Sequence, residues 1–120
     1  MNKTATVRER LRDLLSKPDY LAGWLRSQSK GGINDPKLFT PADMSDCPLW
    51  HFLNHHLQGI APDIDLQVAG TVRWSDETGS HRVNLPQWAR EYVCRVDALE
   101  DEGVVTFNYL KALTVLGDCI

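Results

Sequence analysis

The sequence predicts an α+β fold that is predominantly helical, with about five helices packed against one two-stranded antiparallel β-hairpin. Several stretches carry apolar residues at the three- and four-residue spacing of amphipathic helices, whereas residues 64–85 alternate apolar and polar side chains as strands do. A turn-forming run at residues 75–79 divides the alternating region in two. Because two strands alone are marginally stable, we expect the helices to cover them.

The length and composition fit one globular domain spanning residues 1–120, since 42% of the residues are hydrophobic and 24% are charged. The formal net charge of −3 provides no basic field, so nonspecific nucleic-acid binding is disfavoured. No stretch approaches the roughly 18 apolar residues of a membrane span, and no apolar signal segment opens the chain. Three widely spaced cysteines suggest no disulfide framework. We therefore expect a soluble cytoplasmic protein without membrane association.

Two helices are expected near the N-terminus. Thr4 or Thr6 can cap the first, which ends near Lys17. Its inner face carries Val7, Leu11, Leu14 and Leu15. Pro18 opens the second helix, and Gly31 and Gly32 terminate it. Its apolar stripe consists of Leu21, Trp24 and Leu25.

A central helix is expected over residues 46–59. Asp46 or Ser45 can cap it, Pro48 is tolerated in its first turn, and Gly59 supplies a left-handed residue at its end. Its core face carries Leu49, Trp50, Leu53 and Leu57. Its opposite face carries Cys47, His51 and His55.

The alternating region predicts one strand over residues 64–74, with a bulge or bend at Gly70, and a second over residues 80–85 after a loop of about five residues. A helix follows from Pro86 to Leu99, with Cys94 at the edge of the core. Its inner residues are Trp88, Ala89, Tyr92, Val93, Val96 and Leu99. Thr106 is expected to cap a final helix ending at Gly117, with Val105 and Leu110 forming a hydrophobic staple. Its inner face is predicted to consist of Phe107, Leu110, Leu113 and Leu116.

The central helix carries the residue types that could bind a metal. His51 and His55 lie four residues apart, so both could offer an imidazole nitrogen to one zinc ion. Cys47 lies one turn earlier, but three ligands spread over about 12 Å of straight helix cannot all reach one ion. His81 could complete a set only if the hairpin folded over this face. A solvated or interface-lining polar face is therefore favoured over a metal site.

Cys47 is also the candidate nucleophile. A helix N-terminus favours a thiolate, and a histidine one turn away could serve as its base. The neighbouring carboxylate of Asp46 opposes ionisation, so a half-buried structural cysteine is the favoured interpretation. Arg8, Arg10 and Arg12 form a small basic strip mixed with acidic residues, which is typical of a solvated face.

Three short patterns are similar to those of small uncharacterised bacterial and phage proteins, a resemblance that implies no activity: Cys-Pro-Leu-Trp at 47–50, Leu-Pro-x-Trp at 85–88 and Val-Asp-Ala-Leu at 96–99. The sequence favours a non-catalytic protein that binds another macromolecule through a protein–protein interface. It could be a regulator, an inhibitor such as a phage-borne anti-defence protein, or an assembly subunit. The interface candidates are Trp24, His51, His55 and His81.

The alternative is a small metal- or thiol-dependent enzyme centred on Cys47, His51 and His55. The expectation is that the protein has no cofactor and no assigned catalytic residue. A homodimer formed through the hairpin edge or the Trp24 face also remains open.

Overall fold

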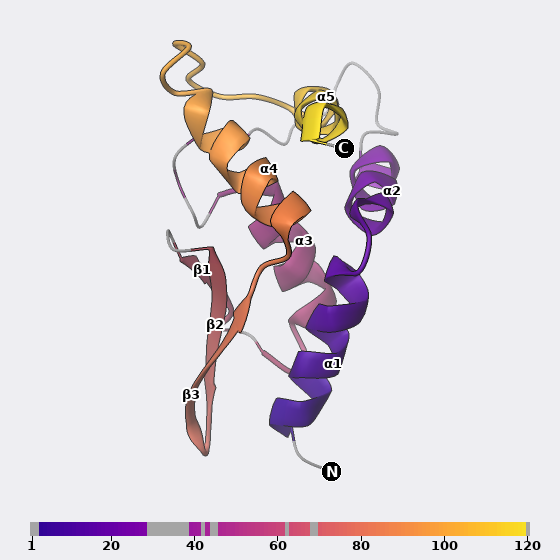
Figure 1. The fold of residues 1–120 in the computed structure, drawn as a ribbon, viewed down its shortest axis with the longest axis vertical. Coiled ribbons are helices and arrows are strands. Elements are labelled where there is room, and N and C mark those ends of the chain that lie inside the picture. Colours follow the sequence, from indigo (N-terminus) through magenta and orange to yellow (C-terminus); the bar gives the residue numbers. More distant parts are fainter. Residues whose placement is uncertain are drawn as a thin grey trace.

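The computed structural model describes residues 3–28, 39–41, 43, 46–61, 63–67 and 70–119, with the side chains of residues 3–5 left out. Within these ranges, helices and strands follow one another in the order α1 (Lys3–Leu15), α2 (Pro18–Gln28), α3 (Pro48–Leu57), β1 (Asp65–Gln67), β2 (Thr71–Asp76), β3 (Gly79–Asn84), α4 (Gln87–Ala98) and α5 (Tyr109–Cys119). The helical majority of the α+β prediction is confirmed (Figure 1). The prediction of two strands is wrong, because the structure contains a three-stranded antiparallel sheet in the order β1-β2-β3.

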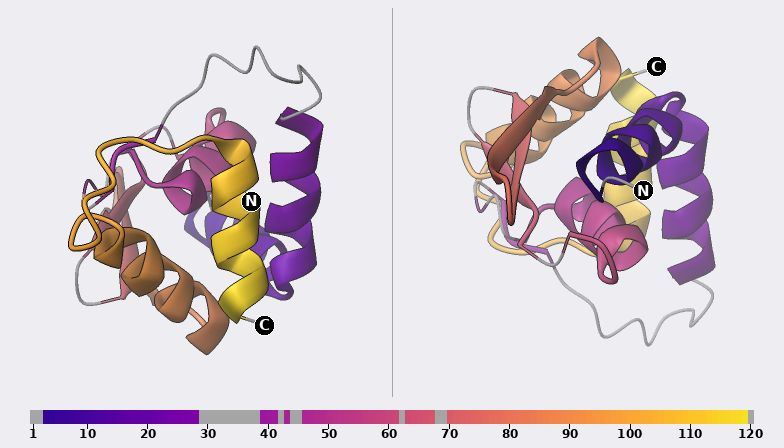
Figure 2. Two further views of the ribbon diagram at one scale, coloured as in Figure 1. Left: turned by 90° about the horizontal axis from the view of Figure 1, so that it is seen from above. Right: turned by 90° about the horizontal axis from the view of Figure 1, so that it is seen from below.

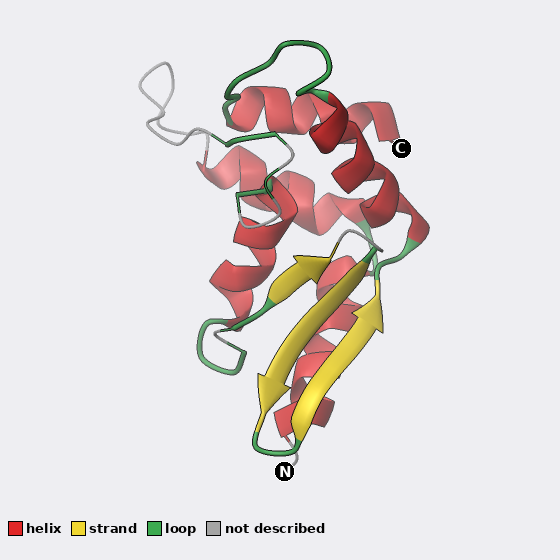
Figure 3. Ribbon diagram, turned by 90° about the vertical axis from the view of Figure 1, so that its left-hand side faces the viewer, coloured by secondary structure: helices red, strands yellow, loops and turns green. Residues whose placement is uncertain are grey.

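The helices cover one face of the sheet (Figure 3). α1 lies against that face at β2 and β3, and α2 runs alongside α5 (Figure 2). α4 packs on α5, and α3 contacts α1 and α2. The buried side chains form one hydrophobic cluster, to which the sheet contributes Leu66, Val72 and Trp74. None of the described helices combines the length and apolar character that a membrane span requires.

The alternating stretch around Gly70 forms two strands where one was predicted. Gly70 has a φ of 82°, its amide donates to the carbonyl of Gln67 (2.9 Å), and the chain reverses there. β1 then pairs with β2, so that Leu66 faces Val72. Leu66 and Val72 both have even residue numbers. The residues that face the core therefore have even numbers on both sides of the turn, which is also what one continuous strand would give. Alternation therefore could not reveal the turn, and the predicted Val68 position lies outside the described residues.

The second hairpin has a shorter loop than predicted. Asp76 pairs with Gly79, which leaves two loop residues, Glu77 and Thr78, where a loop of about five was expected. Gly79 has a φ of 121°. The carboxylate of Asp76 accepts hydrogen bonds from the amide and the hydroxyl of Thr78 (2.8 and 2.6 Å). These bonds let Ser75 and Asp76 continue the strand.

The ends of α3 differ from the prediction. Its N-cap residue is Cys47, and Pro48 occupies the first turn as expected. The carboxylate of Asp46 contacts Nε2 of His51 and the amide of Thr40 instead of capping the helix. Gly59 is not in the left-handed region. Instead, the amides of Ile60 and Ala61 donate to the carbonyl of Leu57 (3.0 and 2.7 Å) and continue the chain as turns. Leu49, Leu53 and Leu57 are buried as predicted, Trp50 is only partly buried, and Phe52 is a buried residue that the prediction missed.

The final helix begins later than predicted. α5 starts at Tyr109, and Asn108 caps it by accepting a hydrogen bond from the amide of Lys111 (3.1 Å). Phe107 instead forms a β-bridge with Phe39, and the two rings pack 5.5 Å apart. The predicted staple is wrong, because Val105 is 80% and Leu110 62% exposed. The predicted inner face is confirmed at Leu116 and in part at Leu113, is wrong at Leu110, and includes Phe107, which is buried but precedes the helix. The buried residues of α5 are Tyr109, Ala112, Val115 and Leu116.

Other helix boundaries need smaller corrections. α1 begins at Lys3, before both threonines expected to cap it, and Gly117 lies inside α5. The predicted inner face of the 86–99 helix is confirmed, apart from Trp88, which is partly buried, and Pro86 serves as its N-cap. The indole nitrogen of Trp88 donates to the carbonyl of Leu15 (2.9 Å), which ties α4 to the end of α1. The predicted end at Gly31 and Gly32 and the alternative cap Ser45 lie outside the described residues.

Candidate functional site

His51 is held by a carboxylate next to its own helix. Its Nε2 lies 2.8 Å from Oδ1 of Asp46, while Oδ2 of Asp46 accepts a hydrogen bond from the amide of Thr40 (2.9 Å). The imidazole also packs against the ring of Phe39, with centroids 5.4 Å apart. His51 therefore joins the segment around residues 39–41 to the start of α3.

His55 lies on the exposed side of α3. Its ring packs against Trp24 of α2 (6.0 Å between centroids) and against His56 (5.0 Å). Partial burial lowers the pKa of His56 below its ordinary value, and the neighbouring His55 and Arg10 add to this effect. This edge of α3 therefore disfavours additional positive charge.

His81 belongs to a separate group on the hairpin. Its Nε2 lies 2.9 Å from both Oδ1 of Asp76 and Oγ1 of Thr78, and its ring lies 5.4 Å from Trp74. The Nε2 atom of His51 therefore contacts Asp46, whereas the Nε2 atom of His81 contacts a different carboxylate, that of Asp76. Throughout the part of the chain that the structure describes, no three His, Cys, Asp or Glu side chains are grouped to hold a metal ion.

Cys47 lies in the core and not on an open polar face. Its residue exposure is 1%, and burial raises the pKa of its thiol to about 12. The thiol is therefore protonated at neutral pH and shielded from solvent, which removes both conditions that a nucleophilic cysteine needs. Cys94 is exposed on α4, which corrects the expected position at the edge of the core.

Trp24 packs mainly inward. Its ring lies 5.9 Å from Phe52 and 6.1 Å from Tyr109, in a tilted and an edge-on arrangement. The residue is partly buried and contacts the hydrophobic cluster. It therefore joins α2 to α3 and α5, and its role as an interface anchor stays a prediction.

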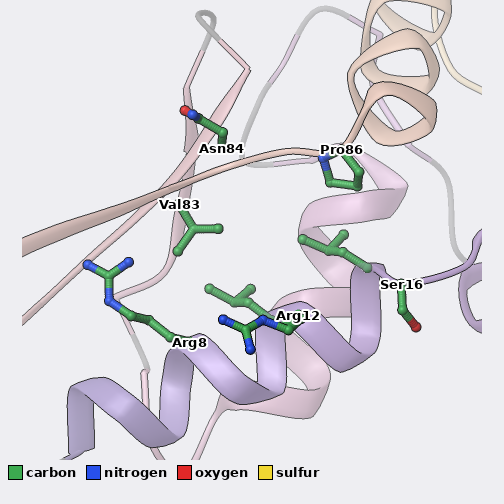
Figure 4. A pocket seen from close by; sticks show the side chains of 8 residues that line it. Arg8, Arg12, Ser16, Val83, Asn84 and Pro86 are labelled. Atoms are coloured by element: carbon green, nitrogen blue, oxygen red, sulfur yellow. The ribbon is translucent and has the colours of Figure 1, made fainter.

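A cleft of about 420 Å³ separates α1 from β3 (Figure 4). Its residues come from α1, from β3 and from the connection to α4. Val83 points from the strand toward α1, and Arg8 extends from α1 toward the strand (Figure 4). The cleft is lined by Arg8, Leu11, Arg12, Leu15, Ser16, Val83, Asn84 and Pro86.

The cleft combines apolar walls with positive charge. Arg8 and Arg12 lie four residues apart on one side of α1. Nη1 of Arg8 donates to the carbonyl of Arg82 (3.2 Å), and its guanidinium carbon lies 5.5 Å from the centre of the Trp74 ring. The eight lining residues include no carboxylate. This arrangement suits a ligand that is apolar in part and carries negative charge.

The sequence interpretation missed this site because it treated the basic strip as a solvated face. The structure divides the strip: Arg8 and Arg12 line the cleft, whereas Arg10 acts on His56. The available signal was that Arg8 and Arg12 flank Leu11 on the helix, but the opposite wall comes from residues more than seventy positions away.

No protein-family model, curated protein or solved structure matches the chain.

Proposed function

We propose that this protein is a non-catalytic binding protein that recognises another protein through the cleft between α1 and β3. The observation that supports it is the combination of apolar walls and two arginines in one open cleft. Partly apolar, concave sites with a few charged groups are typical binding sites, and arginine is enriched at protein interfaces. The site would serve a regulator, an inhibitor or an assembly subunit equally well.

The enzyme alternative has less support from the geometry. Its nucleophile, Cys47, is buried and has a raised pKa, and its proposed base, His51, is bonded to Asp46. His55 faces Trp24 and His56 instead of the thiol. Trp24, His51, His55 and His81 remain candidates for a secondary part of the interface.

Site-specific photo-crosslinking in the native host tests the proposal. A photoreactive residue replaces Asn84, an exposed residue that lines the cleft, and a matched control carries it at Glu100 in the turn after α4. We expect a discrete protein adduct from position 84 only. Arg8→Ala combined with Arg12→Ala should abolish the adduct, whereas Arg10→Ala on the same helix should leave it unchanged.

Two outcomes would contradict the proposal. Adducts of equal yield from positions 84 and 100 would mean that the cleft is not the contact surface. An adduct that survives the double arginine variant would mean that the guanidinium groups do not recognise the partner. Circular dichroism and thermal unfolding of each variant confirm that it is folded, since Arg8 also contacts Arg82 and Trp74.

A further inference from the structure

β3 is an edge strand whose outer side borders the cleft. In the order β1-β2-β3 its only strand partner among the described residues is β2. The carbonyl of Arg82 accepts a hydrogen bond from Arg8 of α1, so it points away from β2. In an antiparallel pair, backbone groups point toward the partner and away from it at alternate residues. The outward set on β3 is therefore Ser80, Arg82 and Asn84.

The cleft follows this edge. Val83, Asn84 and Pro86 form its strand side, and Leu11 and Leu15 form its helix side. An extended chain placed along β3 would pair its backbone with the outward groups and direct alternate side chains toward α1, beside Val83. A folded surface would reach the rim, whereas an extended segment fits both the backbone edge and the apolar walls.

The charges indicate the chemistry of that segment. Arg8 and Arg12 stand on the helix side, and Arg82 is exposed on the strand itself. The whole chain is acidic, with a net charge of −3, so this edge is positive against the overall balance. A second copy pairing through the same edge would bring the arginines of both copies together, which like-charge repulsion opposes.

We propose that the β3 edge receives an extended segment of a partner protein as a fourth strand, and that this segment carries both acidic and apolar residues. The apolar residues occupy the cleft beside Val83, and the acidic residues pair with the guanidinium groups at its rim. This inference rests on the proposed function and specifies the partner's conformation and charge.

Selection from a random library of linear twelve-residue peptides provides the probe. The library is selected on the wild-type protein and counter-selected on Arg8→Gln combined with Arg12→Gln, a neutral variant in which each side chain keeps a hydrogen-bond donor. We expect enriched peptides to contain both acidic and apolar residues and to bind the neutral variant about tenfold more weakly. Methylation of alternate backbone nitrogens in such a peptide should weaken binding by about tenfold or more, because it removes ladder donors.

Amide hydrogen exchange locates the bound peptide. In the free protein, the amides of Ser80, Arg82 and Asn84 should exchange faster than those of His81 and Val83, which point toward β2. Peptide binding should slow exchange at the first three by about tenfold or more and leave the other two protected. Unchanged exchange at the first three with a bound peptide would overturn strand addition.

The remaining outcomes separate this inference from the proposed function. If no peptide is enriched while the position-84 adduct forms with a folded partner, the strand inference is wrong and the binding function stands. If neither peptide enrichment nor the adduct occurs, both are wrong. Peptides rich in lysine or arginine would overturn the charge assignment. A dimer in sedimentation equilibrium that protects Ser80, Arg82 and Asn84 would identify a second copy as the occupant and overturn the inference.

Discussion

Gly70 provides a direct test of the third strand, because alanine at this position should be costly for two separable reasons. Its φ of 82° lies in the left-handed region, which costs a residue with a Cβ about 1–2 kcal/mol. A Cβ at this position would also lie 2.8 Å from Cδ of Arg90, which would force that side chain to move. A displaced, off-rotamer side chain costs about 0.5–1.5 kcal/mol.

Gly103 is a matched control. Its φ is 84°, and its amide donates to the carbonyl three residues earlier, as the Gly70 amide does. A Cβ added to Gly103 would meet nothing within 4 Å. We therefore expect Gly103→Ala to lower the free energy of unfolding by about 1–2 kcal/mol, the backbone cost alone. Gly70→Ala should cost about 0.5–1.5 kcal/mol more, the part due to Arg90.

Urea denaturation of the two glycine variants, in the wild-type and the Arg90→Ala backgrounds, measures both contributions. In the Arg90→Ala background the excess cost of Gly70→Ala should disappear, because the obstructing Cδ is gone. An excess that persists there would refute the assigned contact. A negligible cost at Gly70 beside a normal cost at Gly103 would refute the turn, and with it the separation of β1 from β2.

Three further predictions concern buried and titrating groups. Tyr92→Phe should lower the free energy of unfolding by about 1–1.5 kcal/mol in urea denaturation, because it removes a buried 3.1 Å hydrogen bond to an α5 carbonyl; no loss would contradict this. Cys47 should resist Ellman's reagent in the native protein at pH 8 while exposed Cys94 reacts, and equal rates would disprove the burial of its thiol. His56, whose pKa is lowered by partial burial and by His55, takes up a proton less readily in the folded than in the unfolded state, so stability should fall as the pH drops through about 6.5. Thermal unfolding between pH 8 and pH 5 should therefore show a smaller loss for His56→Gln than for the wild type, and equal losses would reject this assignment.

The helices with a long apolar repeat could be predicted from the sequence. Val7, Leu11 and Leu15 of α1, and Tyr92 and Val96 of α4, are buried as their spacing indicates. These faces are set by a local period of 3.6 residues, so no knowledge of distant partners is needed. The same holds for α3, where Leu49, Leu53 and Leu57 form the core face. Local periodicity thus accounts for most of the α+β prediction.

The errors arise where distant partners decide the structure. Phe107 fits the helical pattern but is buried by its bridge to Phe39, which delays α5 to Tyr109 and turns Leu110 outward. The reversal at Gly70 was hidden because paired residues on β1 and β2 keep the same parity. In both cases the sequence pattern is compatible with two structures, and the tertiary pairing selects one of them.

The candidate site shows the same dependence, since Arg8 has two partners only because β2 and β3 both lie beside α1. Its hydrogen bond to the Arg82 carbonyl covers one exposed backbone group of the β3 edge, and a covered edge is protected against unwanted strand pairing. Its contact with the Trp74 ring of β2 holds the side chain over the sheet. Each contact is individually weak, on the order of 1 kcal/mol at an exposed position. A carboxylate on an incoming strand offers Arg8 a charge-assisted bond in exchange, and such bonds are about twice as strong as neutral ones. The same side chain therefore can protect the edge in the free protein and release it to an acidic strand, while a neutral or basic strand would gain no such compensation.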